Sequence, residues 1–566
     1  MKKYRSSKLP PKDVLPDRQD IERRMLFRRN LKTEEEAEKF LNISYERDTN
    51  DPFLMTGMKE AVSRILKAME SGEHIAVFGD FDADGLCASV CWQDFFRRAG
   101  YQNYSFYIPH RHEEGFGVSR EALFELLKKG VSLVITVDCG VADGEALEEA
   151  TEAGLDIIVT DHHEPVNGLP QVFAVLDPKR KDCSYPDPDL SGAGVAFKLI
   201  QGLLSKERFG IPEGHEKWLL DLVGIATISD SVPLLGENRV LARYGLLVLR
   251  KSPRVGIMKL CRKLNLSQSD LTEDDIGFMI APRLNAASRM GEVADAFTLL
   301  ATEDEAEAER AVSGLEKLNN ERKGVVAVMV KDVKQNKTSL QENDVIVTGN
   351  PKWRPSLLGL VANSLAEEFS KPVFLWGRDG SNNIKGSCRS GGGVDLLALM
   401  SHAEGFFEQY GGHRFAGGFS VRFEDIHRLK EGLNEAYLKN GIKAEYEEVL
   451  VDGVLSLSDV NDRFYNTIER FSPFGMGNPK PVFKFAGVFI KEVRPFGKQK
   501  EHLEIILADE KGLKVKAIGF FLKPPDLEKD PKEGDQVTVI ATLERSFFRG
   551  RTELRLRLVD VLSVRS

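Results

Sequence analysis

The fold is decided by one stretch of the sequence, residues 75–86, which reads Ile75-Ala76-Val77-Phe78-Gly79-Asp80-Phe81-Asp82-Ala83-Asp84-Gly85-Leu86. The apolar residues predict a buried strand, and the acids and glycine that follow predict a turn into a helix starting at Leu86. Alternating acids also begin an EF-hand calcium loop, but that loop needs Glu at its twelfth position, which is Cys91 here. The stretch therefore predicts a strand whose carboxyl end presents a cluster of carboxylates.

Three further apolar runs end in an acid. They are Leu133 to Val137 before Asp138, Ile157 to Thr160 before Asp161, and Phe173 to Leu176 before Asp177. Apolar runs that alternate with amphipathic stretches predict βαβ units on a parallel sheet, whose carboxyl edge is where ligands bind. One Asp there could simply cap a helix, whereas four on neighbouring strands would repel one another without a bound cation.

Two histidines and one more acid extend this cluster. His162 and His163 follow Asp161, and Asp230 ends an apolar stretch that we expect to be buried. A lone histidine is more often a core or surface residue, but a tandem pair beside carboxylates favours ligation of Mn²⁺ or Mg²⁺. Two such ions about 3.5–4 Å apart can activate a water and stabilise an oxyanion leaving group at phosphorus. The sequence therefore predicts a two-metal phosphoesterase site.

The pattern of apolar and polar residues divides the whole chain into five regions. Residues 1–50 are expected to be a helical lead-in, 51–240 the parallel-sheet domain, 241–335 a helical connector, 336–445 a second α/β domain, and 446–566 a β-barrel or sandwich. Residues 303–323 are strongly charged and periodic, which predicts an exposed linking helix. The fold class is therefore α/β with a C-terminal β domain.

Composition bounds the function classes. The 566-residue chain has a net charge of −9, which argues against a surface coated in basic charge and leaves room for a local basic channel. None of its six cysteines forms a C-x-x-C pair, so reduced, buried thiols are expected. No signal-peptide pattern and no apolar run of about 20 residues is found, and we expect a cytoplasmic protein.

The motifs resemble those of a known superfamily. Asp80-x-Asp82-x-Asp84, Asp138-Cys139-Gly140, Asp161-His162-His163 and Asp230 are similar to the four motifs of the DHH phosphoesterases. Residues 411–418, Gly-Gly-His-Arg-Phe-Ala-Gly-Gly, resemble the GGH motif of the accessory DHHA1 domain. Residues 109–117, 281–290 and 474–479 resemble the bacterial RecJ exonucleases in particular. The resemblance runs from about residue 45 to residue 566 and implies a C-terminal OB-fold.

The resemblance also assigns roles to residues. It implies metal binding by Asp82, Asp84, Asp138, His162 and Asp230, with Asp80 joining the cluster, and a contact of His163 with the scissile phosphate. These residues, Asp80 apart, form the expected catalytic set. It further implies phosphate or strand binding by Arg111, Arg289, Ser387, Arg389 and His413. No metal ligand of the family pattern is missing.

Three other arginines are candidates for substrate binding. Arg283 suits a phosphate, although a salt bridge is an open alternative. Arg549 and Arg551 lead into alternating leucines and arginines, which place a basic face beside two aromatics. Such a face suits single-strand binding, and an ordinary hairpin with a solvated outer face is the alternative.

Taken with the resemblance, these features predict a single-stranded-DNA-specific exonuclease that works 5′→3′, releases 5′-mononucleotides, and acts in recombination and repair. A single-stranded-DNA-binding protein and a repair helicase are implied partners, and a monomer is expected. Two alternatives stay open. One is a DHH phosphodiesterase of short oligonucleotides or cyclic dinucleotides, and the other is a non-catalytic scaffold that binds single-stranded DNA.

Overall fold

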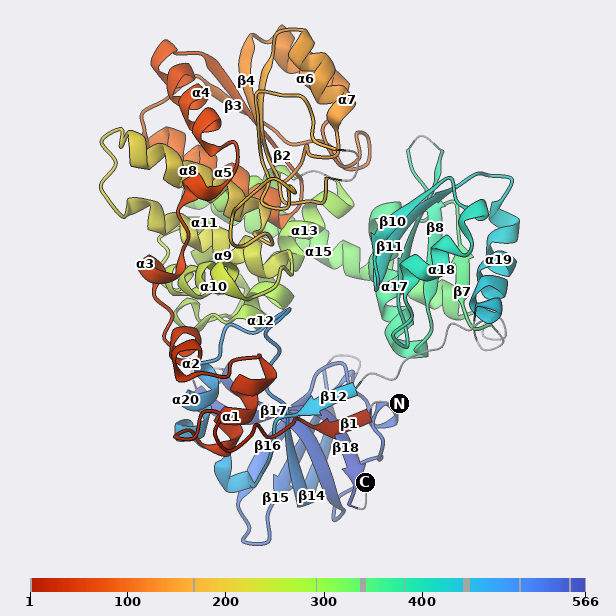
Figure 1. The fold of residues 1–566 in the computed structure, drawn as a ribbon. Helices are drawn as coiled ribbons and strands as arrows, with labels where there is room; N and C mark the ends of the chain where they lie inside the picture. Colours follow the sequence, from red (N-terminus) through yellow and green to blue (C-terminus); the bar gives the residue numbers. More distant parts are fainter. Residues whose placement is uncertain are drawn as a thin grey trace.

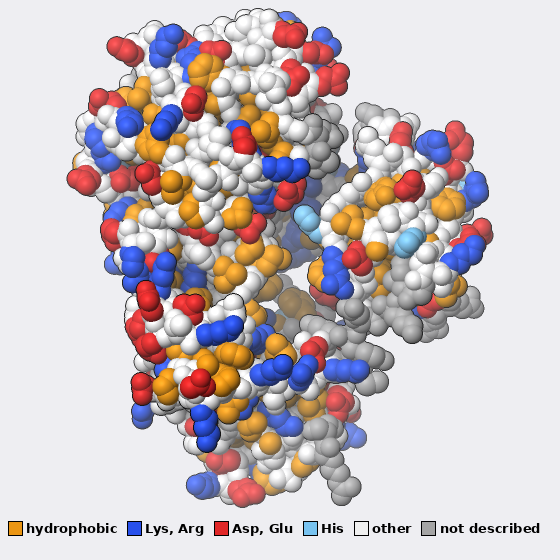
Figure 2. Space-filling model, in the orientation of Figure 1, with side chains coloured by type: hydrophobic (Ala, Val, Ile, Leu, Met, Phe, Trp, Pro, Cys, Tyr) orange, Lys and Arg blue, Asp and Glu red, His pale blue; other side chains and the backbone are white. Residues whose placement is uncertain are grey.

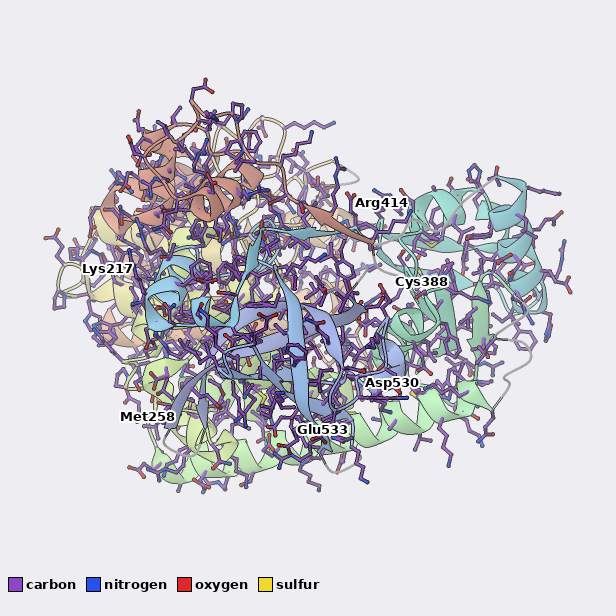
Figure 3. All side chains as sticks on the ribbon, turned by 90° about the horizontal axis from the view of Figure 1, so that it is seen from below. Lys217, Met258, Cys388, Arg414, Asp530 and Glu533 are labelled. Carbon is purple, nitrogen blue, oxygen red and sulfur yellow. The ribbon has the colours of Figure 1, made fainter. Side chains whose placement is uncertain are left out.

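The computed structural model describes residues 3–165, 168–291, 293–335, 340, 343–380, 382–440, 448–497, 500–548 and 551–564. Figure 1 shows an elongated body, in which an α/β domain, a layer of helices and a β-barrel follow one another, and a second α/β domain set to one side. The long helix α15 (Glu305–Lys334) joins the body to that second domain. Seen from the barrel end, α15 runs along one side of the molecule toward the second domain (Figure 3).

The first domain contains a five-stranded, fully parallel sheet of order β3-β2-β4-β5-β6. Its strands are β2 (His74–Gly79), β3 (Tyr104–Tyr107), β4 (Val131–Val137), β5 (Asp156–Thr160) and β6 (Ala174–Leu176). Side chains of β2 alternate between two cores, with Ile75 and Val77 facing one side and Ala76 and Phe78 the other. The four predicted strands are thus confirmed, and the half-buried edge strand β3 is the one that the apolar pattern misses.

Helices cover both faces of this sheet. One face packs against α4 (Met58–Ser71), α5 (Ala83–Arg98) and α8 (Gly192–Lys206), and the other against α6 (Arg120–Lys128) and α7 (Gly144–Glu152). The remaining helices of the body are α3 (Tyr45–Asp48), α9 (Leu220–Ser229), α10 (Gly236–Leu249), α11 (Val255–Leu264), α12 (Glu273–Asp275), a π-helix (Ile276–Ile280), α13 (Ala281–Met290), α14 (Ala294–Ala301) and α15, and those from α11 onward lie within the connector. Among the described residues, no helix is both long and apolar enough to cross a membrane.

The second domain has a mixed five-stranded sheet of order β10-β11-β9-β8-β7, in which β7 and β8 are parallel and the other neighbours antiparallel. Its elements are β7 (Ile346–Gly349), α17 (Pro355–Phe369), β8 (Val373–Arg378), β9 (Ile384–Arg389), α18 (Leu396–Ser401), β10 (Gln409–His413), β11 (Ala416–Val421) and α19 (Ile426–Lys439). The predicted second α/β domain is confirmed, with an antiparallel half that the sequence does not reveal.

The C-terminal domain is a closed barrel. Strands follow the order β14-β15-β16-β18-β17, and β17 pairs back onto β14. The domain consists of β12 (Glu448–Val451), β13 (Gly453–Leu455), α20 (Asp462–Glu469), β14 (Phe483–Phe496), β15 (His502–Ala508), β16 (Lys514–Gly519), β17 (Gln536–Phe548) and β18 (Arg551–Ser563). This closure and strand order are those of a five-stranded OB-fold, as expected.

The N-terminal segment belongs physically to this barrel, although the two lie at opposite ends of the chain. Strand β1 (Lys3–Ser6) pairs with β12, and α1 (Asp20–Arg28) and α2 (Glu34–Leu41) pack on the barrel (Figure 1). Met25, Leu26 and Ala37 are fully buried in the barrel core. The lead-in is thus part of a second core, a long-range contact that local sequence patterns cannot show.

The buried side chain of Asn478 holds together a loop of the barrel domain that also contacts the helical part of the body. The Asn478 amide donates to the carbonyls of Phe471 (2.8 Å) and Pro473 (2.7 Å), and its oxygen accepts from Arg29 Nε (2.6 Å). Arg239 of α10 donates to the same Phe471 carbonyl (2.7 Å). Residues 471–479 therefore form a loop held from both sides.

We predict that Asn478→Ala lowers the free energy of unfolding by about 2–3 kcal/mol, because buried carbonyls and Arg29 lose their hydrogen-bond partner. Urea denaturation followed by circular dichroism measures the change. The exposed Arg463→Ala on α20 is the control, and it should change stability by less than about 0.5 kcal/mol. Equal stability of the two variants would contradict this role of Asn478.

Candidate functional site: a carboxylate and histidine cluster

The acids of the opening stretch lie where β2 passes into α5. Asp82 is the N-cap of the helix, and its Oδ1 accepts from the backbone N–H groups of Asp84 (2.8 Å) and Gly85 (3.2 Å). The helix therefore begins at Ala83, three residues before the predicted start at Leu86, because an Asp cap satisfies its first free N–H groups. Because the cap fixes the backbone at this point, it also helps to set the directions of the neighbouring carboxylates, Asp80 and Asp84.

The carboxylate of Asp84 lies at the N-terminus of a second helix, α8. This carboxylate accepts from the backbone N–H groups of Gly192 (2.8 Å) and Ala193 (2.7 Å), the first two residues of α8. Positive partial charge at a helix N-terminus stabilises a carboxylate there. The approach is close: a Cβ on Gly192 would lie 2.4 Å from Asp138 Oδ1, so only glycine leaves room for that carboxylate. Asp138 itself has a φ of 64°.

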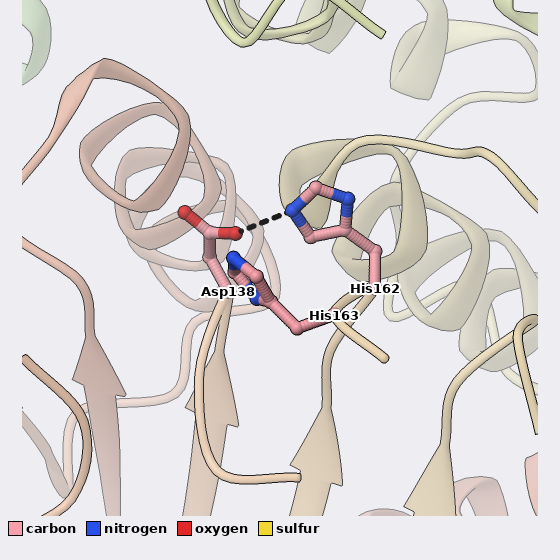
Figure 4. Close-up of side chains that lie close together, drawn as sticks. All are labelled: Asp138, His162 and His163. Carbon is pink, nitrogen blue, oxygen red and sulfur yellow. Dashed lines mark ion pairs between the residues drawn. The ribbon is translucent and has the colours of Figure 1, made fainter. Parts of the chain in front are cut away.

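His162 lies at the centre of the cluster. Its Nε2 is 3.1 Å from Asp138 Oδ1, 3.7 Å from Asp230 Oδ2 and 3.9 Å from Asp84 Oδ2. Figure 4 shows the imidazole pointing at Asp138 from the loop after β5, with His163 beside it. Three groups have ligand atoms within 4.8 Å of one another, namely Asp84, His162 and Asp230; Asp80, Asp82 and Asp138; and Asp138, His162 and His163.

The crowded carboxylates hold their protons strongly when no cation is present. Burial, and then the charge of Asp82, raise the pKa of Asp80 to about 8. The same two causes raise the pKa of Asp230 to about 7, and burial with neighbouring carboxylates raises the pKa values of Asp84 and Asp138 well above the usual range. Burial lowers the pKa of His162 to about 3, which leaves its ring neutral, as a metal ligand must be.

These residues fit divalent ions. Asp80 Oδ1 and Asp138 Oδ1 are buried oxygens without a hydrogen-bond donor among the described residues. Buried carboxylates without donors are costly unless paired or bound to a metal. A donor set of carboxylate oxygens and one neutral imidazole is typical of Mn²⁺ and Mg²⁺ sites, and the two groups that share no residue provide ligands for two ions.

Asp161 holds the loop that carries the histidines. It accepts from the backbone N–H groups of Val141 (2.9 Å) and His162 (2.7 Å), and from His163 Nδ1 (2.8 Å). Burial would lower the pKa of His163, but the hydrogen bond and charge of Asp161 raise it to about 9. His163 is 45% exposed, beside the ring of Phe116. Asp161 thus orients His163, while His163 faces the open side.

Cations gather next to the carboxylates. The guanidinium of Arg111 lies over the Phe81 ring at 4.6 Å. Burial lowers its pKa, and the charges of Asp80 and Asp82 offset only part of this effect. Burial, and then the positive charges of Arg111, Arg322 and Arg389, lower the pKa of Arg289 to about 10. This concentration of positive charge suits an anion.

The second domain contributes to the same region. Arg289 Nη1 donates to the Ser356 carbonyl of α17 (2.7 Å), and Ser356 Oγ donates back to the Arg289 carbonyl (3.0 Å). Arg389 donates to Ser387 Oγ (3.1 Å) on the same strand β9. His413 pairs with Ala416, which in turn pairs with Arg389, so an exposed imidazole and a guanidinium share one row of the sheet. Figure 2 shows an open groove between the body and this domain, with Lys and Arg on its inner wall.

The remaining candidates lie elsewhere or outside the description. Arg283 is buried and paired with Glu316 of α15, which is the ion pair left open by the sequence. Arg549 lies outside the described residues, and only the backbone of Arg551 is described. Sequence reasoning also misses Asn285 of α13, whose Oδ1 accepts from Ala83 N (2.8 Å) at the start of α5. Only its place in residues 281–290 hints at this contact.

We predict that Mn²⁺ stabilises the protein more at about pH 8 than at about pH 6. The raised carboxyl pKa values mean that the ion-free folded state binds more protons than the unfolded chain, so its stability falls as the pH rises toward about 8. A bound ion removes this repulsion. The melting temperature, measured with EDTA or Mn²⁺ at each pH, gives the comparison.

The matched control is Asp138→Asn, which keeps the shape and tolerates the positive φ. Because one buried charge is removed, the melting temperature of this variant should depend less on pH and should rise little when Mn²⁺ is added. An equal rise in the melting temperature of the wild-type protein with Mn²⁺ at both pH values would contradict the role of carboxylate repulsion.

Family models match three regions of the chain. The DHH family N-terminal domain matches residues 74–227, the DHHA1 domain residues 342–439, and the RecJ OB domain residues 451–560. These regions coincide with the parallel-sheet domain, the second α/β domain and the barrel. The expected fold class is confirmed.

Relatives with curated names agree with the family models over nearly the whole chain. The single-stranded-DNA-specific exonuclease RecJ of Bacillus subtilis (strain 168) is 34% identical over 95% of this chain and 67% of its own length. The enzyme of the same name from Haemophilus influenzae is 31% identical over 90% of this chain and 91% of its own.

Solved structures agree as well. RecJ from Thermus thermophilus in complex with Mn²⁺ superposes with a TM-score of 0.81 at 28% identity, covering 99% of this chain and 79% of that one. The same protein was also solved with Mg²⁺, and the expected cofactors, Mn²⁺ or Mg²⁺, are thereby supported. This chain is a metal-dependent nuclease acting on single-stranded DNA, and it belongs to the RecJ family of single-stranded-DNA-specific exonucleases.

Proposed function

We propose that the protein hydrolyses single-stranded DNA from the 5′ end and releases 5′-mononucleotides. The observation that carries this proposal is the meeting of seven acidic and histidine side chains with a cluster of arginines at the entrance of one groove. The first set can hold ions and the second can hold a terminal phosphate, which is the geometry that end-specific hydrolysis needs. Roles in recombination and repair follow from the family alone and are proposed on that basis.

The proposed metal ligands are Asp80, Asp82, Asp84, Asp138, His162 and Asp230, divided between two ions. The ions would supply Lewis acidity and a water of lowered pKa. The protein contributes rigid positions: the two helix N-termini orient Asp82 and Asp84, and Gly192 keeps the space around Asp138 open. Rigid placement avoids reorganisation during the reaction.

His163 is proposed to contact the scissile phosphate. Its Nδ1 is bound to Asp161, which would leave Nε2 for the substrate, and its raised pKa keeps the ring protonated at neutral pH. A protonated imidazole can donate a charge-assisted hydrogen bond to a phosphate oxygen. His163 would therefore stabilise the negative charge that develops at phosphorus.

The terminal 5′ phosphate is assigned to Arg111, Arg289, Ser387 and Arg389, with His413 facing it from across the groove. The forked guanidinium group suits bidentate contact with phosphate oxygens. Because Ser387, Arg389 and His413 belong to the second domain, this arrangement would require both domains to hold the same end. A groove too narrow for duplex would explain the preference for single strands.

The domain boundaries that we propose are 1–50, 51–240, 241–335, 336–445 and 446–566. The barrel, through Arg549, Arg551 and its basic face, would hold the strand beyond the active site. A monomer in the cytoplasm, working with a single-stranded-DNA-binding protein and a repair helicase, is our proposal for its setting. A substrate of cyclic or very short nucleotides is less favoured, because the RecJ OB domain would then have no role.

We predict that a long single strand labelled at its 5′ end loses the label early as a mononucleotide in the presence of Mn²⁺. The same strand labelled at its 3′ end should shorten progressively and keep its label until late, and a matching duplex should stay intact. Electrophoresis of timed samples resolves these products. Earlier release of the 3′ label would contradict the proposed polarity.

We also predict that His163→Ala lowers kcat by about 10²–10³, because a donor to the developing charge is lost. Calorimetric titration should show that its Mn²⁺ affinity stays close to that of the wild type. Asp84→Asn is the comparison, and it should lose both activity and Mn²⁺ binding. If His163→Ala also lost Mn²⁺, the histidine would be a ligand and not a phosphate contact.

A further inference from the structure

A pocket of about 270 Å³ lies beside the metal cluster, and of its lining residues the proposed function uses only Arg289. Its walls come from the π-helix, α13 and α15, together with Ser229, the neighbour of Asp230, and Leu360 of α17. The pocket therefore reaches from the edge of the metal cluster to the second domain. The π-helix follows α12, whose Asp274 is paired with Lys480 of the barrel domain, so one wall of the pocket continues directly into a segment that contacts the barrel domain.

All the charged side chains in the described lining of this pocket are cationic. Its described lining contains four cations, Arg283, Arg289, Arg322 and Lys323, and no carboxylate. Glu316, two turns before Lys323 on α15, is paired with Arg283, and its charge also acts on Lys323. Burial and then the charge of Arg283 lower the pKa of Arg322, which reflects the mutual repulsion of these groups. Like charges collected in a half-buried site call for a bound anion.

Two buried donors in the same lining have no acceptor. Asn319 is fully buried, and its Nδ2 has no hydrogen-bond partner among the described residues. Arg322 uses Nη2 on Asn319 Oδ1 (2.9 Å), while its Nε is buried without a partner in the described part of the chain. Buried donors are normally satisfied, so these two indicate a ligand with acceptor oxygens.

An aromatic side chain completes the site. Phe278 of the π-helix lines the pocket and is 68% exposed, which is unusual for a large apolar residue. A cationic groove with an exposed ring is the combination that binds single strands, through phosphate contacts and base stacking. A π-helix is rare, and it often occurs at functional sites.

We propose that Asn319, Arg322, Lys323 and Phe278 form a subsite for the DNA strand beyond the terminal nucleotide, in which the polar residues hold backbone phosphate and Phe278 stacks on a base. This subsite rests on the proposed function, because it extends the same substrate from the metal cluster toward the barrel. It gives long strands a contact that the shortest oligonucleotides cannot reach. Strand length should therefore affect KM through this pocket.

The test compares Arg322→Ala/Lys323→Ala with Arg310→Ala/Lys317→Ala, which removes the same charge from the same helix outside the pocket. The rate is measured with Mn²⁺ on single strands from a few nucleotides to long ones. For the wild type and the control, KM should fall as the strand lengthens. For the pocket variant, kcat/KM on long strands should drop by about tenfold or more, and activity on the shortest cleaved strand should fall by much less.

Binding without catalysis gives a second readout. Anisotropy of a labelled long strand in EDTA, over a series of salt concentrations, should show a slope of log K against log salt that is smaller by about 1.4 in the pocket variant, since each phosphate contact with a single strand contributes about 0.7. Phe278→Ala should weaken long-strand binding and leave this slope unchanged.

Two results would overturn the subsite. One is an equal loss of activity on short and long strands, which would assign these residues to the metal site or the fold. The other is a pocket variant that matches its control in KM and salt slope. Failure of the proposed function is distinguishable, because the wild-type protein would then fail to release nucleotides from a 5′ end.

Discussion

Repulsion among buried carboxylates is the constraint on which the rest of this structure depends. Asp80, Asp84 and Asp138 lie at one edge of a parallel sheet, each almost completely buried. Burial and mutual repulsion raise their pKa values, so the ion-free site tolerates a full set of charges poorly. The protein offsets part of this cost with the N-termini of α5 and α8 and with the neutral ring of His162, and divalent ions would offset the remainder.

The helical connector joins the metal site to the second domain, which forms the other side of the groove. One helix, α13, contacts the start of α5 at Ala83 through Asn285 and the second domain through Arg289. These two residues are four positions apart and thus lie on one face of the helix. A shift of the second domain would therefore act on the loop that presents Asp82 and Asp84. The metal site and the second domain are therefore joined through one helix by these two hydrogen bonds.

The fold and the centre of the site could be predicted because their signals are local. Apolar runs ending in acids at residues 80, 138 and 161 mark parallel strands, and parallel strands bring their carboxyl ends together. What could not be predicted depends on distant contacts. The packing of α1 and α2 in the barrel core joins opposite ends of the chain, and Asn285 reaches Ala83 across 202 residues. Arg322 and Asn319 look like the polar face of a charged helix until the fold buries them against α13.

The most direct test of the metal cluster is an anomalous difference map from crystals of this protein grown with Mn²⁺. We expect two peaks, one among Asp84, His162 and Asp230 and one among Asp80, Asp82 and Asp138. Peaks elsewhere in the molecule, or none at this sheet edge in a folded protein, would contradict the assignment of these residues as the catalytic centre.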